Sequence, residues 1–208
     1  YDALPPATQA QVGNYAKLQA AEATYAELLA QAVKAVKDQI DALPATPLTD
    51  ATKKLSEYNK VKAAREAYNA LSNAEKAVVD NYDKLTAAEA AFAAISGGAS
   101  SIADAQAAVD LINAIPSPVA YDAASKNAID AARAAVDALG ANASLIDDAD
   151  LQKLTDAEAA YATAKTEAVN AVKTAIDALP ATPLQDADKK LSEYNKVLGA
   201  RAAYDALL

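Results

Sequence analysis

The chain has 208 residues, of which more than a quarter are alanine and only five are glycine, a composition that favours long helices over a mixed α/β fold. It contains no Cys, His, Met or Trp, which excludes disulfides, thiolate or imidazole metal sites and catalysis by Cys or His. The net charge of −9 argues against a nucleic-acid partner, because affinity for a phosphate backbone comes mainly from Lys and Arg.

An internal repeat is the strongest feature of the sequence. Similar tetrapeptides, spaced by 67 or 68 residues, occur at 1–4 (YDAL), 68–71 (YNAL), 136–139 (VDAL) and 204–207 (YDAL). A second motif follows in step at 15–25 (YAKLQAAEATY), 82–92 (YDKLTAAEAAF) and 151–161 (LQKLTDAEAAY). Residues 25–71 and 161–207 are identical at 33 of 47 positions, so the repeated unit is about 68 residues long.

Each unit contains three segments in which apolar residues recur at three- and four-residue steps, the pattern of an amphipathic helix. In the first full unit these stripes are Leu29, Val33, Val36, Ile40 and Leu43, then Leu55, Tyr58, Val61, Tyr68 and Leu71, then Val78, Tyr82, Leu85, Phe92 and Ile95. We predict that tyrosines such as Tyr58, Tyr68, Tyr82 and Tyr194 pack in the core with their hydroxyls at its rim. The alternative is a platform on which carbohydrate rings stack.

The corner between the first and second helices has a repeated sequence, IDALPATPL at 40–48 and 176–184 and INAIPSPVA at 112–120. Pro44 cannot continue a helix, and Thr46 followed by Pro47 is typical of an N-cap with proline at the first helical position. The pairs Ser117 with Pro118 and Thr182 with Pro183 repeat this chemistry. We therefore predict a tight corner at each copy rather than a proline-rich ligand, which would need a longer extended run.

The corner between the second and third helices also carries capping signals. Ser72 and Glu75 have the spacing of a capping box, and Ser144 with Asp147 imitates it after Gly140 ends the preceding helix. Each unit should therefore read helix, corner, helix, corner, helix.

Consecutive units are predicted to share helices. No helix-breaking pair occurs from about Ala7 to Leu43 or from Ser144 to Leu179, so each stretch should be one helix of some 36 residues, ~55 Å long. At the middle junction Gly97 and Gly98 should stop one helix, and Ser101 with Asp104 should cap the next. The predicted organisation is the last helix of a preceding repeat (1–24), a three-helix repeat (25–96), a second after the Gly-Gly joint (97–160), and the first two helices of a following repeat (161–208).

The segments ARAAYDAL (200–207), DKLTAAEAA (83–91) and AIDALPA (175–181) resemble the Ala-rich helical repeats of large surface proteins of Gram-positive bacteria. The layout of three-helix units joined by uninterrupted helices is similar to spectrin repeats and to the rod modules of giant staphylococcal-type adhesins, although this unit is shorter than a spectrin repeat. The resemblance implies an all-α, spectrin-like rod and an extracellular stalk within a protein associated with the cell wall or the S-layer.

Some acidic and basic residues are grouped or recur in the repeats and are candidates for binding sites. Asp147, Asp148 and Asp150 could hold Ca²⁺ weakly, but they lack the Gly and terminal Glu of an EF-hand loop, and acids at a helix start complement the helix dipole. Glu22, Glu89 and Glu158 occupy one repeated position, and Arg65, Arg133 and Arg201 occupy another. We predict structural ion pairs of ~0.2–1 kcal/mol each, joining Arg65 to Asp80 and Arg133 to Asp148.

The sequence therefore predicts a structural spacer that holds other modules away from the cell envelope, with no catalytic, cofactor-binding or metal-binding residue. The alternative is an adhesin module that presents a pair of helices to a host protein. We expect the partners to be adjacent repeats, a second copy bound head to tail, or a host or envelope protein, and not nucleic acid. No apolar run approaches the roughly 20 residues that span a bilayer. Tyr1 opens in the middle of the repeat pattern without a signal peptide in these residues, so we expect the chain to be an excerpt of a longer protein.

Overall fold

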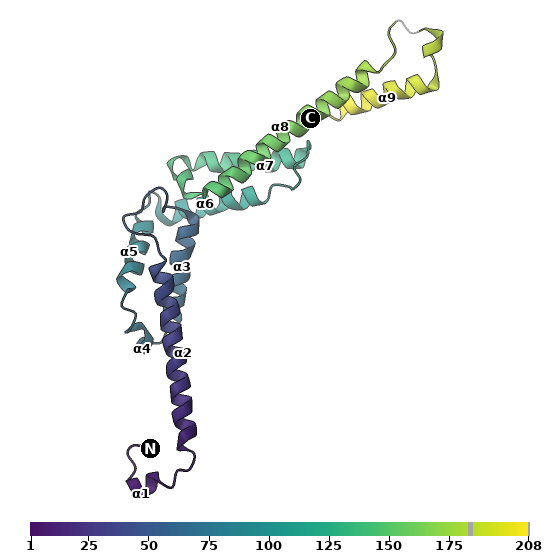
Figure 1. Cartoon of the computed structure of the whole chain (residues 1–208). Coiled ribbons are helices and arrows are strands. Elements are labelled where there is room, and N and C mark those ends of the chain that lie inside the picture. Colours follow the sequence, from purple (N-terminus) through teal and green to yellow (C-terminus); the bar gives the residue numbers. More distant parts are fainter. Residues whose placement is uncertain (183–184, 208) are drawn as a thin grey trace. The chain divides into compact units, whose positions relative to one another are not determined.

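The computed structural model describes residues 1–182 and 185–207. For Ala187 it describes the backbone only. The described residues form helices and connecting segments without a strand (Figure 1), which confirms the all-α class. The chain divides into two units, residues 1–98 and 99–208. None of the described helices is both long enough and apolar enough to cross a membrane.

The first unit is built around one long helix. Its helices are α1 (Pro6–Gln9), α2 (Tyr15–Asp41), α3 (Leu55–Ala70), α4 (Asn73–Lys76) and α5 (Tyr82–Ala93). Helix α2 contacts α3, α4 and α5, and α3 contacts α5. The buried core comes from the predicted stripes and consists mainly of Val36, Ile40, Leu43, Leu55, Val61, Leu71, Leu85, Phe92 and Ile95.

The second unit also contains one long helix. Its helices are α6 (Gly98–Asn113), α7 (Ala123–Ala138), the 3₁₀ helix η1 (Gly140–Leu145), α8 (Asp148–Asp177), the 3₁₀ helix η2 (Asp186–Asp188) and α9 (Leu191–Asp205). Helix α8 contacts both α7 and α9. Two side-chain hydrogen bonds join α6 to η1 and α8. Asn142 of η1 donates to Ser101 (3.0 Å), and Lys153 of α8 donates to Asn113 (3.2 Å).

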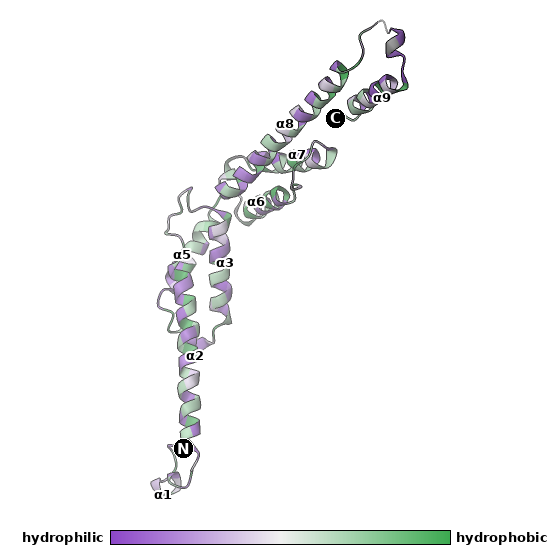
Figure 2. Cartoon of the chain, turned by 45° about the vertical axis from the view of Figure 1, so that its right-hand side comes forward, coloured by the Kyte–Doolittle hydropathy of each residue, from purple (hydrophilic) through white to green (hydrophobic). Residues whose placement is uncertain are grey.

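Helices α2 and α8 run without a break through residues 25 and 161, where consecutive repeats were expected to meet. The C-terminal half of α2 (residues 29–41) is packed within the unit, whereas the N-terminal half (15–28) extends past α4 with no neighbouring helix (Figure 1). Polar and apolar residues alternate along both long helices (Figure 2). The N-terminal half of α8 (148–161) lies beside α7, and its C-terminal half (162–177) lies beside α9.

Both long helices begin later than predicted. The stretch from Ala7 is not one helix, because α1 ends at Gln9 and α2 starts only at Tyr15, after turns that contain Gly13 and Asn14. Asn14 has a non-helical backbone (φ −108°, ψ 14°) that Asn tolerates well. Helix α8 likewise begins at Asp148 rather than Ser144.

The third helix of the first full unit is interrupted in the same way. Asn81 precedes α5 with φ −102° and ψ 16°, nearly the backbone of Asn14, and the chain between α4 and α5 is not helical. The predicted stripe was therefore wrong at Val78, whose side chain is exposed, while Val79 is buried in its place.

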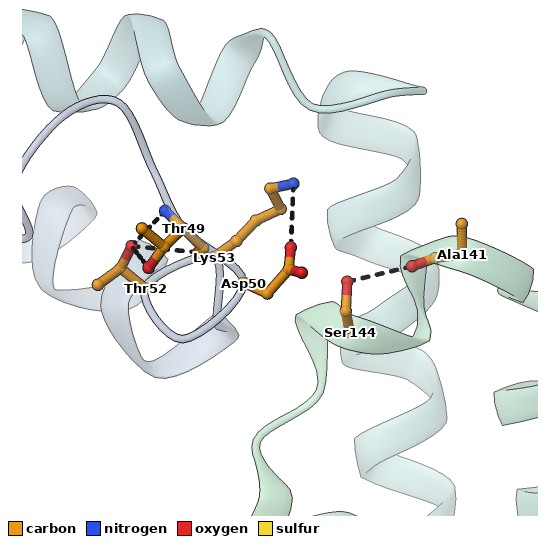
Figure 3. Close-up of polar contacts among 6 residues, drawn as sticks. All are labelled: Thr49, Asp50, Thr52, Lys53, Ala141 and Ser144. Atoms are coloured by element: carbon orange, nitrogen blue, oxygen red, sulfur yellow. Dashed lines mark hydrogen bonds and ion pairs between the residues drawn. The ribbon is translucent and has the colours of Figure 1, made fainter.

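The first corner is a loop rather than the tight turn that was predicted. Helix α3 begins at Leu55, not at Pro47, because Thr49 and Thr52 form a closed turn (Figure 3). The backbone N–H of Thr49 donates to Oγ1 of Thr52 (2.8 Å), and the N–H groups of Thr52 and Lys53 donate to the Thr49 carbonyl. Hydroxyl side chains that bond nearby backbone in this way compete with helix formation.

In the other two copies of this corner the second helix also begins later in the sequence than predicted. Helix α7 begins at Ala123 rather than Pro118, with Asp122 as its N-cap accepting from the backbone N–H of Ser125 (2.7 Å). This hydrogen bond holds the pKa of Asp122 below its usual value. In the last copy of the corner, α9 begins at Leu191. Pro183, which was predicted to start this helix after Thr182, lies outside the described residues.

Of the predicted caps, the capping box at Ser72 and Glu75 is present, with both hydrogen bonds formed, but it starts the short helix α4. The similar cap predicted at Ser144 with Asp147 is wrong, because the Ser144 hydroxyl donates to the Ala141 carbonyl within η1 (Figure 3). Ser101 is not a cap either, since it lies buried inside α6.

Glycine does end helices where it was expected to. Gly97 (φ +81°) lies between α5 and α6, Gly98 (φ +53°) is the first residue of α6, and Gly140 (φ +53°) follows α7. These left-handed conformations favour Gly because it has no Cβ.

Candidate functional site

The two charged positions that recur in each repeat pair with each other. Arg65 on α3 donates two hydrogen bonds to the Glu89 carboxylate on α5, with Nε–Oε1 and Nη2–Oε2 distances of 2.5 and 2.6 Å. In the second unit Arg133 on α7 binds Glu158 on α8 in the same bidentate way, at 2.7 and 2.8 Å. The recurrent pair therefore joins the second helix of a repeat to the third.

Two tyrosines enclose the pair in the first unit. The rings of Tyr68 and Tyr82 stack with centroids 4.4 Å apart, and the Arg65 guanidinium carbon lies 5.5 and 5.2 Å from their centroids. Arg65 also donates to the Tyr82 hydroxyl (3.2 Å). The hydrogen bonds to Glu89 raise the pKa of Arg65 further above its usual value. Tyr68 and Tyr82 thus pack at the rim of the core as predicted, around an ion pair that is partly shielded from water. The same prediction was wrong for Tyr194, which is 59% exposed.

The ion pairs predicted from the sequence were wrong in register. Asp80 binds Lys37 of α2 (2.8 Å) rather than Arg65, and this hydrogen bond lowers the pKa of Asp80. The register was counted from residue 72 as though the third helix were unbroken, but the turn before Tyr82 shifts every later residue. In the second unit Arg133 binds Glu158 and not Asp148.

A second polar link joins the third helix to the C-terminal end of the first. In the first unit Asn81 donates to the Lys37 carbonyl (3.0 Å) and to the Asp41 carboxylate (2.8 Å), and Lys84 donates to the Asp41 carbonyl (2.6 Å). The bond from Lys153 to Asn113 is its counterpart in the second unit.

The two remaining residues at these recurrent positions, Glu22 and Arg201, form no ion pair with another helix among the described residues. Glu22 is exposed on the N-terminal half of α2, and among the described residues no ion pair to it is formed. Arg201 on α9 contacts two residues of its own helix, Asp205 one turn along at 3.5 Å and Tyr204, whose ring centroid lies 5.9 Å from the guanidinium carbon. The recurrent glutamate and arginine at the two ends of the chain therefore lack the cross-helix pairing seen in the middle.

The acidic cluster is accounted for by the start of α8. Asp147 is the N-cap residue, and Asp148 and Asp150 lie in the first turn, where carboxylates interact favourably with the helix dipole. Asp150 pairs with Lys153 (2.7 Å). Over residues 1–182 and 185–207, no three side chains of metal-binding type are grouped together.

One hollow on the first unit is open and mostly apolar. It measures about 480 Å³, lies between α2 and α4 and is lined in part by Leu29, Val33 and Val78. The lysines at its edge are paired with acids, Lys34 with Asp38 and Lys37 with Asp80, rather than directed at a common point.

The recurrent pair gives a direct test of the register. A double-mutant cycle on Arg65 and Glu89, using alanine at each, is expected to give a coupling energy of about 1–2 kcal/mol in urea unfolding, because the pair is bidentate and partly buried. The same cycle on Arg65 and Asp80 should give no coupling. Coupling to Asp80 in place of Glu89 would contradict the observed register.

No family model, no curated protein and no solved structure matches this chain. The repeats within the chain are similar to one another in sequence, so equivalent positions can be compared. The same arginine and glutamate, the same apolar stripe and the same corner sequence recur, and they serve packing in both units.

Proposed function

We propose that this chain is a structural spacer, built from tandem three-helix repeats that share helices in the manner of a spectrin-like rod. Its task is to hold other modules at a distance from a bacterial envelope, as part of an extracellular protein associated with the cell wall or S-layer. The resemblance to Ala-rich repeats of Gram-positive surface proteins supports the location, and the packing of the repeats supports the role.

The observation that carries the proposal is the polarity of the surface where three helices lie together. From residue 29 to residue 175, all of which are described, the exposed large apolar side chains are Val78 and Leu111. A module that binds another protein through a helix pair would expose an aromatic or aliphatic patch there. A spacer needs only buried stripes and solvated outer faces.

Shared helices supply the stiffness that a spacer requires. Helix α2 has 27 residues and α8 has 30, so each is about 40–45 Å long at 1.5 Å per residue. Bending between repeats that share such a helix would have to break backbone hydrogen bonds in its middle. The net charge of −9 keeps the outer faces solvated and opposes collapse of one repeat on another.

Small-angle X-ray scattering at low protein concentration tests the proposal. A spacer on the order of 100 Å long has a radius of gyration of about 30 Å, whereas a compact globule of this length has one of about 17 Å. A value near the compact figure would overturn the spacer. Retention of one dominant protein from host serum by the immobilised chain would favour the adhesin alternative.

A further inference from the structure

The two units use nearly the same third helix. Residues 82–92 and 151–161 are identical at 7 of 11 positions, and both segments carry a buried leucine and the glutamate that binds an arginine of the second helix. These shared groups would serve equally well if a third helix packed on the wrong unit, and such misassembly is a characteristic folding error of repeat proteins. Only residues that differ between the units can distinguish correct from incorrect pairing.

One such difference is an amide and a carboxylate that exchange places. In the first unit Asn81, just before α5, donates to the carboxylate of Asp41 at the end of α2 (2.8 Å). The corner sequences at 40–48 and 112–120 align Asp41 with Asn113, and the motifs at 82–92 and 151–161 align Asn81 with Asp150. The first helix therefore carries the carboxylate in one unit and the amide in the other, and the third helix carries the complementary group.

A lysine that both units share lies beside this pair. Lys84 donates to the backbone carbonyl of Asp41 (2.6 Å). Lys153, at the same position of the repeat, donates to the side chains of Asn113 (3.2 Å) and Asp150 (2.7 Å). Each correctly paired unit thus places one lysine, one carboxylate and one amide at the end of its first helix.

An ion pair at the same interface also changes as a pair. Lys37 of α2 binds Asp80 at 2.8 Å in the first unit. The same alignments match Lys37 with Val109, which is 8% exposed, and Asp80 with Ala149. The second unit has therefore lost both charges together, and neither unit keeps one charge without the other.

We propose that these exchanged positions make each third helix specific for the first helix of its own unit. The start of α8 packed on α2 would bring Asp150 to Asp41, so that two carboxylates would share one lysine. Helix α5 packed on α6 would place Asp80 beside the apolar Val109 and would leave its charge unpaired. The inference concerns how similar repeats fold side by side and does not depend on the spacer function.

Exchanging the pair in the first unit tests whether the two positions are coupled. Asn81→Asp alone should raise the unfolding equilibrium constant of that unit about tenfold in urea, because it loses two donated hydrogen bonds and sets two carboxylates together. The double variant Asp41→Asn with Asn81→Asp recreates the arrangement of the second unit, and it should recover to within about threefold of the wild type. A double variant no more stable than Asn81→Asp would overturn the proposal.

The same double variant tests specificity, because it gives both units the same amide and carboxylate arrangement. It should form more domain-swapped dimer than the wild type when the full chain is refolded from urea at about 100 μM, although its stability is nearly that of the wild type. Size-exclusion chromatography with light scattering measures the dimer fraction. Asn113→Asp with Asp150→Asn makes the units alike in the opposite way and should have the same effect.

The matched control exchanges an amide and a carboxylate that bond each other along one helix. Gln152 donates to Asp156 on the exposed face of α8 (2.7 Å), so Gln152→Asp with Asp156→Gln keeps the net charge and should leave the dimer fraction at the wild-type level. A dimer fraction that stays at the wild-type level in both equalised variants, or that rises as much in the control, would contradict a role in helix pairing.

Discussion

Replacing Leu85 or Leu154 by alanine is expected to lower the free energy of unfolding by about 2–5 kcal/mol, whereas Leu18→Ala should change it by about 0.5 kcal/mol or less. The three leucines occupy one position of the repeat, so the residue type and its helical setting are matched. Leu85 and Leu154 are fully buried against neighbouring helices, and Leu18 is half exposed on the unpartnered part of α2.

Urea unfolding followed by circular dichroism provides the measurement, at a protein concentration low enough to keep the chain monomeric. The unfolding curve should be fitted with one transition for each unit, because a chain of two units need not unfold in a single transition. Equal losses at all three positions would contradict the difference in burial.

Proline at Ala162 is expected to destabilise the second unit by about 3 kcal/mol or more. Ala162 is exposed near the middle of α8, where the helix passes from its packing with α7 to its packing with α9. Proline there removes the N–H that bonds the carbonyl four residues back and clashes with that carbonyl.

Ala162→Gly is the matched control, because it keeps the N–H and should cost only about 1 kcal/mol. Thermal unfolding with helical content measured at 222 nm separates the two variants. A proline variant as stable as the glycine variant would show that no continuous helix is needed at this junction.

The helical stripes, the repeat length and the glycine stops could be predicted from sequence because each depends on local pattern. Ile40, Leu85 and Phe92 fall at three- and four-residue steps, and all three are buried in the structure. Gly140 has the left-handed backbone that ends a helix. Periodicity and backbone conformation of this kind need no knowledge of tertiary contacts.

The starts of the helices were predicted poorly because capping signals compete. Thr46 and Pro47 suggested a helix start, but the Thr52 hydroxyl accepts from the backbone N–H of Thr49 and donates to its carbonyl, and α3 starts only at Leu55. In the dipeptides Asn14-Tyr15 and Asn81-Tyr82, the asparagine is the N-cap and the tyrosine is the first residue of a helix. This repeated Asn was the sequence signal that could have located both starts.

The ion pairs were missed because cross-helix register depends on loop geometry. The sequence showed that arginine and glutamate recur, but a count from residue 72 matched Arg65 with Asp80. A turn of five residues before Tyr82 moves Glu89 opposite Arg65 instead. Since the arginine and the glutamate recur together, pairing the two recurrent positions with each other would have been the better rule.

The continuity of α8 across the junction of two repeats is tested most directly by a distance between spin labels on that helix. The chain has no cysteine, so cysteines introduced for Gln152 and Asn170, both exposed and 18 residues apart, would be the only labelling sites. Five full turns of unbroken helix place their Cα atoms about 27 Å apart on one face, and double electron–electron resonance should give one narrow distribution consistent with that spacing. A broad distribution, or one shorter by several ångströms, would contradict the shared helix.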